Sequence, residues 1–226
     1  MTQRDRTARA PRRQASTGSR RFPLIPVAIA AVVVLVLAVA LAVALAGSGG
    51  RATSGEPARE PVKVSGQALA AYPASGSGGA DPAVGQTIPT ISGVTFDNSP
   101  MSIGPDDGPM ILVFVAHWCP HCQAEVPRIQ DWLDGGGLPD GVKLLTVATS
   151  TSPTQPNYPP SAWLEREHWT PPVLVDDKDS TALQAFGMSS FPAFVFVDAN
   201  GQVAARTTGE LAIDQLDAIA TQLAAG

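Results

Sequence analysis

Cysteine is scarce in this sequence: its 226 residues contain two, Cys119 and Cys122. A zinc ribbon needs four ligands, usually two CxxC pairs or one pair with two spaced histidines, and the sequence offers no second half of either kind. A disulfide between these two cysteines would close a loop of a few residues, which restricts the unfolded chain very little. Structural zinc and a stabilising disulfide framework are therefore poor explanations of the pair.

Basic residues are also scarce in the C-terminal part. From Asp81 to Gly226 there are five Lys and Arg residues against 17 Asp and Glu, a formal charge of −12. Nucleic acids are bound largely through Lys and Arg, so no nucleic-acid partner is expected. The negative charge is expected to serve solubility, and the alternative is an adaptor surface for a basic partner.

The N-terminal part has a different composition. Residues 1–23 carry seven arginines and one acid, and are predicted to form a basic cytoplasmic tail. Residues 24–46 have no charge, and about 20 apolar residues suffice to cross a bilayer as a helix. The positive-inside rule then predicts a single-pass anchor in the cell membrane, with everything after it outside the cytoplasm. A cleaved secretory signal is the alternative, although its apolar core is shorter, about 7–15 residues. Residues 47–80, rich in Gly, Ser, Ala and Pro, are predicted to be a flexible linker.

Residues 81–226 show the pattern of an extracytoplasmic α/β domain. Short apolar runs between turn residues predict strands at 110–115, 142–149, 173–175, 193–197 and 202–206. Helical patterns are found at 120–133, 161–168, 180–186 and 211–223. Strands that alternate with helices indicate a mixed central sheet flanked by helices, and residues 91–96 with 101–103 are expected to add a hairpin at its edge.

The position of the two cysteines favours redox chemistry. The strand at 110–115 leads into a turn, and Pro120 suits the first position of a helix, so Cys119 would cap that helix. A helix N-terminus stabilises an anion, which makes the Cys119 thiolate the expected nucleophile. Pro120 and a protonated His121 would tune its reactivity. Cys122, one turn later, is expected to face inward, to stay protonated, and to resolve the mixed disulfide.

The motif WCPHC at residues 118–122, followed by Pro127, resembles the active site of thioredoxin-like proteins. The resemblance covers most of residues 84–226 and implies a thioredoxin fold. Phe191 and Pro192, which precede an apolar strand, match the cis-proline loop of that family. The resemblance implies that this loop lies against the CxxC motif, binds substrate backbone, and has a cis peptide bond before Pro192.

Two further positions refine the resemblance. Thioredoxins proper have a buried acid six residues before the first cysteine, where this chain has Val113. Membrane-tethered proteins of the TlpA and ResA type instead have the pattern WCxxCxxExP, which Glu125 and Pro127 match. The resemblance implies that Glu125 shuttles a proton for the buried thiol of Cys122, one turn away. A solvated helix carboxylate is the alternative.

Other residues near the motif carry weaker expectations. Trp118 is expected to pack beside the disulfide and to help bind substrate. His117 is expected to be a solvated neighbour without a function. The proline-rich loop at 150–160 is expected either to recognise a partner or to be a passive connection.

The sequence thus predicts an envelope-anchored thiol–disulfide oxidoreductase that needs no cofactor beyond its Cys119–Cys122 disulfide. Its expected partners are exported proteins that contain cysteine, and a membrane or extracytoplasmic redox protein. We favour a reductase or isomerase of the cytochrome c maturation or copper-site type. The dipeptide Pro120-His121, however, matches DsbA-type oxidants, because a histidine beside the thiolate stabilises the reduced form. A copper metallochaperone that holds Cu(I) between the two thiolates is the alternative of another class.

Overall fold

The computed structural model describes residues 61–73 and 79–226. The predicted tail, the predicted transmembrane helix at 24–46 and part of the predicted linker lie outside these residues. Within the described ranges, no helix is both long and apolar enough to span a membrane. The elements in chain order are β1 (Lys63–Ser65), β2 (Thr90–Val94), β3 (Pro100–Ile103), η1 (Pro105–Asp107), β4 (Met110–Val115), α2 (Pro120–Asp134), β5 (Lys143–Ala148), α3 (Pro160–Arg166), β6 (Val173–Val175), α4 (Thr181–Ala185), β7 (Ala193–Val197), β8 (Val203–Thr208) and α5 (Ile213–Ala225).

The strands form one mixed sheet in the order β1-β2-β6-β5-β4-β7-β8, and β3 pairs with β2 beside this path. Strands β4, β5 and β6 are parallel to one another. On the other side of β4, β7 pairs antiparallel with β4, and β8 pairs antiparallel with β7. The mixed sheet that the sequence predicts is confirmed, and so is the extra hairpin, which joins the β6 edge through Val94 and Val175.

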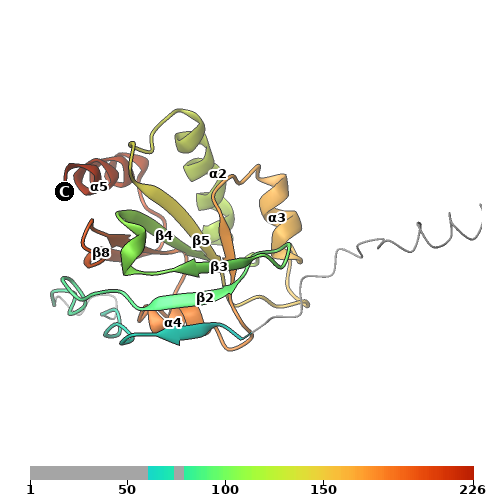
Figure 1. The fold of residues 1–226 in the computed structure, drawn as a ribbon. Coiled ribbons are helices and arrows are strands. Elements are labelled where there is room, and N and C mark those ends of the chain that lie inside the picture. Colours follow the sequence, from blue (N-terminus) through green and yellow to red (C-terminus); the bar gives the residue numbers. More distant parts are fainter. Residues whose placement is uncertain (1–60, 74–78) are drawn as a thin grey trace, which may run out of the picture. The chain divides into compact units, whose positions relative to one another are not determined.

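Strand β4 is buried along its whole length because helices cover both faces of the sheet. Its side chains alternate: Met110, Leu112 and Phe114 belong to one hydrophobic cluster, while the residues between them belong to the other. Helices α2, α3 and α5 supply the second cluster, and α4 packs on the first. Figure 1 shows α2 and α3 above the sheet and α4 at the bottom of the view.

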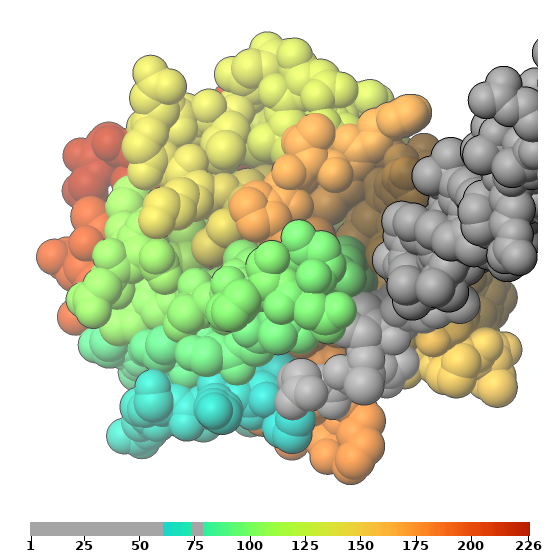
Figure 2. Space-filling view, turned by 45° about the vertical axis from the view of Figure 1, so that its right-hand side comes forward, coloured from blue at the N-terminus to red at the C-terminus, as the bar shows by residue number. Residues whose placement is uncertain are grey.

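The prediction of a flexible linker at 47–80 is wrong for residues 61–73. Strand β1 pairs with β2 over three residues, and Val62 and Leu69 are buried in the first cluster. The backbone N–H of Leu69 donates to the Ala185 carbonyl at 2.9 Å, and that of Tyr72 donates to the Gly187 carbonyl at 2.7 Å. In Figure 2 the cyan β1 segment lies along the lower edge of the green hairpin. A few apolar side chains therefore dock this segment on the domain, which begins before Asp81.

Candidate active site

Cys119 lies where β4 ends and α2 begins. It is the N-cap of α2, with an extended backbone, and Pro120 is the first residue of the helix, as predicted. Cys119 is 6% exposed, and its thiol donates a hydrogen bond to the carbonyl oxygen of Phe191 at 3.5 Å. The Cys119 sulfur therefore lies at the positive end of the α2 dipole, just beneath the surface.

Cys122 lies one turn further along α2 and is fully buried, which confirms its predicted inward direction. Its sulfur accepts the backbone N–H of Ala116 at 3.4 Å. Burial raises the pKa of the Cys122 thiol far above the usual value of a cysteine, and the nearby Cys119 and Glu125 raise it further, although the Ala116 N–H opposes the rise. Both cysteines are free thiols in this structure. Cys122 is therefore held as a protonated thiol beneath a more accessible one.

Glu125 is fully buried, so the alternative of a solvated carboxylate is wrong. Its Oε1 accepts the backbone N–H of Leu211 at 3.0 Å, and its Oε2 accepts a hydrogen bond from Arg128 at 3.0 Å. Burial raises the pKa of the Glu125 carboxyl, and the negative charge of Glu210 adds to the rise, whereas Leu211 and Arg128 oppose it. A buried acid whose pKa lies above its usual value is suited to accept and return a proton.

The cis-proline loop lies against the motif from the other side. The peptide bond between Phe191 and Pro192 is cis, as predicted. The ring of Phe191 meets that of Trp118 edge to face, with 5.2 Å between the ring centroids, and both residues are partly buried. The Trp118 indole N–H donates to the Ser150 carbonyl at 2.8 Å. Two aromatic side chains therefore flank the approach to Cys119.

His117 is 1% exposed, so the prediction of a solvated neighbour is wrong. Its Nδ1 lies 2.6 Å from the carbonyl oxygen of Pro156, and its Nε2 accepts the backbone N–H of Ser152 at 3.1 Å. A carbonyl oxygen can only accept, so Nδ1 carries the proton and the ring is neutral in this arrangement. The loop at 150–160 folds back over His117. Because this loop is distant in sequence, the residues around His117 carry no pattern that predicts its burial.

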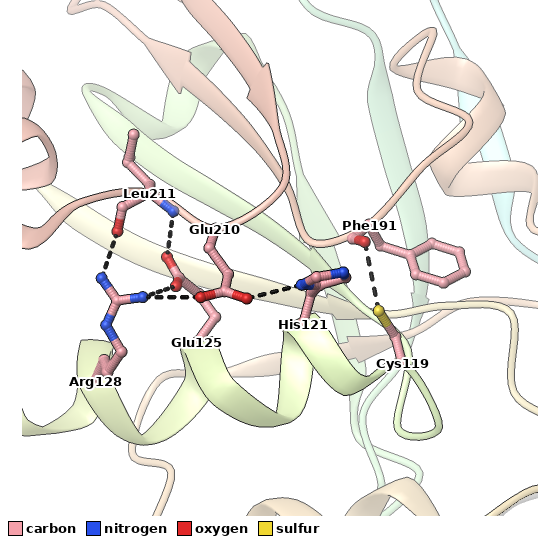
Figure 3. Close-up of polar contacts among 7 residues, drawn as sticks. All are labelled: Cys119, His121, Glu125, Arg128, Phe191, Glu210 and Leu211. Carbon is pink, nitrogen blue, oxygen red and sulfur yellow. Dashed lines mark hydrogen bonds and ion pairs between the residues drawn. The ribbon is translucent and has the colours of Figure 1, made fainter. Parts of the chain in front are cut away.

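His121 is exposed, with 69% of its side chain accessible, and Nδ1 lies 2.7 Å from the Oε1 of Glu210. Glu210 also lies 3.3 Å from Arg128, which donates to Glu125 and to the Leu211 carbonyl. Figure 3 shows these side chains in a row along α2, ending near Cys119. Sequence reasoning missed Arg128, which the i,i+3 spacing from Glu125 could have indicated. It also missed Glu210, for which no pattern existed.

The structure brings together all the residues that the sequence proposed for catalysis and substrate binding. No group of three or more His, Cys, Asp or Glu side chains that could hold a metal ion is found in residues 61–73 and 79–226.

Several known proteins are similar to this chain in sequence or in fold. Residues 84–206, more than half of the chain, match the model of the AhpC/TSA family. The sporulation thiol-disulfide oxidoreductase A of Bacillus subtilis is 25% identical over 122 residues, which cover 54% of this chain and 72% of that protein.

Two solved structures show the same fold. The thioredoxin domain of a thiol-disulfide oxidoreductase from Bacteroides vulgatus has a TM-score of 0.50 at 17% identity, over 62% of this chain and 98% of that one. A thiol:disulfide interchange protein DsbE from Chlorobium tepidum has a TM-score of 0.50 at 18% identity, over 63% and 96%.

Proposed function

The chain belongs to the AhpC/TSA family of thioredoxin-like proteins and is a thiol–disulfide oxidoreductase, and we propose that it reduces or isomerises disulfides of exported proteins. The observation that carries the proposal is the asymmetry of the two thiols. Cys119 is 6% exposed at a helix N-terminus, while Cys122 is fully buried and protonated one turn below, on the same helix as the buried Glu125.

The proposed reaction begins at Cys119. Its thiolate attacks one sulfur of a substrate disulfide, so a mixed disulfide forms and one substrate thiolate leaves and takes up a proton. Trp118 and the cis-proline loop at Phe191 and Pro192 bind the substrate chain beside Cys119. The Cys119 thiol donates a hydrogen bond to the Phe191 carbonyl in the free protein. This bond is lost when Cys119 forms the mixed disulfide, and the Phe191 carbonyl oxygen can then accept a hydrogen bond from a substrate N–H.

The second step releases the substrate. Glu125 accepts the proton of the Cys122 thiol, and the resulting thiolate attacks Cys119, so the intramolecular disulfide forms and the second substrate thiol departs. Two electrons have then passed from the Cys119–Cys122 dithiol to the substrate. A dithiol donor outside the cytoplasm must reduce the pair again.

The direction of electron flow separates a reductase or isomerase from an oxidase. The buried Glu125 supports a reductase or isomerase, because a base near Cys122 speeds the attack of its thiolate on Cys119 and so the release of the substrate from the mixed disulfide. His121 favours the second candidate, a disulfide-forming oxidase, because an imidazolium close to Cys119 would stabilise the reduced protein. We place the domain outside the cytoplasm, anchored through residues 24–46, on the charge pattern of the sequence.

The reduction potential of the pair distinguishes the two candidates. We would equilibrate the purified full-length protein with glutathione buffers and quantify the free thiols, with Cys119→Ser as the inactive control. A potential near or below about −270 mV, that of thioredoxin, is expected for a reductase, whereas one near about −120 mV, that of DsbA, would identify an oxidant. A protein that never reaches equilibrium with glutathione would refute disulfide exchange itself.

A further inference from the structure

Glu210 reaches the catalytic helix from a distant part of the chain. It lies in the segment between β8 and α5, and it contacts α2 at two positions. One carboxylate oxygen lies 2.7 Å from Nδ1 of His121, and the other lies 3.3 Å from Arg128. The Glu210 side chain is 39% accessible, so water reaches it but does not surround it.

The partners of Glu210 occupy one face of α2. His121, Glu125 and Arg128 follow one another at spacings of four and three residues, which places them on the same side of a helix. Figure 3 shows Glu210 above this face, between Arg128 and His121. A single carboxylate therefore spans the first two turns of the helix that carries both cysteines.

Carboxylates outnumber permanent cations in the group that Glu210 joins. Glu125 and Glu210 are two carboxylates, and Arg128 is their permanent cation. His121 is the other side chain that Glu210 contacts, and along α2 it is the member of the group nearest to Cys119. Arg128 is also fixed by the Leu211 carbonyl at 3.0 Å, so it holds Glu210 in place.

We propose that Glu210 is a positioning residue for thiol–disulfide exchange, which holds the His121 ring at the N-terminus of α2 beside Cys119. With Nδ1 engaged by the carboxylate, the ring has one orientation and Nε2 is the nitrogen left to exchange a proton. This inference rests on the proposed function, because it assigns Glu210 a role in the same redox site.

The sign of the effect follows from the reduced state. A carboxylate favours the imidazolium form of a histidine that it contacts, and an imidazolium favours a neighbouring thiolate. The thiolate exists only in the reduced protein, so Glu210 acting through His121 shifts the equilibrium toward the dithiol. Removing its charge shifts the equilibrium toward the disulfide.

The test is a double-mutant cycle on the full-length protein in glutathione buffers. The variants are Glu210→Gln, His121→Ala and the double variant, and the control is Glu165→Gln, which removes the same charge from an exposed position on α3. We expect Glu210→Gln to change the equilibrium constant about threefold toward the disulfide, about 14 mV for a two-electron couple. The change is small because the pair is partly exposed.

The decisive comparison is between Glu210→Gln in the wild-type protein and Glu210→Gln in the His121→Ala protein. If Glu210 acts through that ring, Glu210→Gln leaves the potential of the His121→Ala protein unchanged. An equal shift in both backgrounds, a shift in the opposite direction, or one no larger than that of Glu165→Gln would overturn the proposal. Each of these results leaves exchange by the wild-type protein intact, so they differ from a failure of the proposed function.

Discussion

Replacing Glu125 by Gln is expected to slow the release of substrate from the mixed disulfide while the fold stays intact. The Cys122 thiol is buried and its pKa is far above the usual value, so it needs a base to become a thiolate. General base catalysis by a positioned group typically contributes about 10²–10⁴-fold. We expect a decrease of about 100-fold in the resolving rate at pH 7, because Gln cannot take the proton.

The contacts of Glu125 show why the same change costs little stability. A Gln oxygen can still accept the Leu211 N–H, now 3.0 Å from Oε1. Arg128 loses one ionic partner but keeps Glu210 and the Leu211 carbonyl. Arg128 is 39% accessible, so water can replace the contact that it loses, and the cost should be up to about 1 kcal/mol. Unfolding in urea should therefore change by no more than this amount.

The pH dependence gives a second signature. Only the ionised carboxylate can accept a proton, so the wild-type resolving rate should rise with pH through the folded pKa of Glu125, which burial holds above the ordinary value of a glutamate. Above that pKa the wild-type rate should level off, since the base is then fully ionised. The Gln variant lacks this base, so its rate should keep rising with hydroxide concentration.

Stopped-flow measurement of a mixed disulfide between Cys119 and a chromogenic thiol gives the resolving rate directly. Glu165→Gln is the matched control for loss of one exposed charge. A Glu125→Gln protein that resolves at the wild-type rate, with an unchanged pH profile, would show that Glu125 is only structural and that the proposed second step is wrong.

Three further predictions concern other parts of the domain. Cys122→Ser should trap substrate on Cys119, visible as a covalent adduct on non-reducing gels; release at the wild-type rate would argue against a resolving thiol. His117→Ala should lower the free energy of unfolding by about 2–4 kcal/mol, because two ring hydrogen bonds and a buried side chain are lost, and should speed proteolysis of the loop at 150–160. Unchanged cleavage would mean that the loop is held by other contacts. Arg206→Met should cost about 3–5 kcal/mol in urea unfolding, since it leaves the Asp81 carboxylate without its buried partner; a loss below 1 kcal/mol would contradict this account.

The redox motif was predictable because its geometry is local. The apolar run before Cys119 makes a strand, Pro120 starts a helix, and 3.6 residues per turn then place Cys122 on the inward face. Resemblance to a family added the cis bond before Pro192 and the placement of the loop beside Cys119.

The environment of each titratable residue was not predictable in this way. The solvent exposure of His117 was misjudged because the loop at 150–160, more than 30 residues later, covers it. The burial of Glu125 depends on Leu211, which comes from the segment before α5. The docking of residues 61–73 was hidden by an average composition that resembles a linker, although Val62 and Leu69 are buried.

The sequence by itself therefore determined which atoms carry the chemistry: two thiols one helical turn apart at the start of a helix, with a carboxylate one turn beyond. Spacing along the chain was enough for this, since neighbours in a helix are fixed by its repeat. Only the tertiary structure decided how strongly each group holds its proton. Burial and charge depend on what packs against a side chain, and the groups that matter here, Leu211, Glu210 and the loop over His117, meet α2 and its entry turn only once the chain has folded.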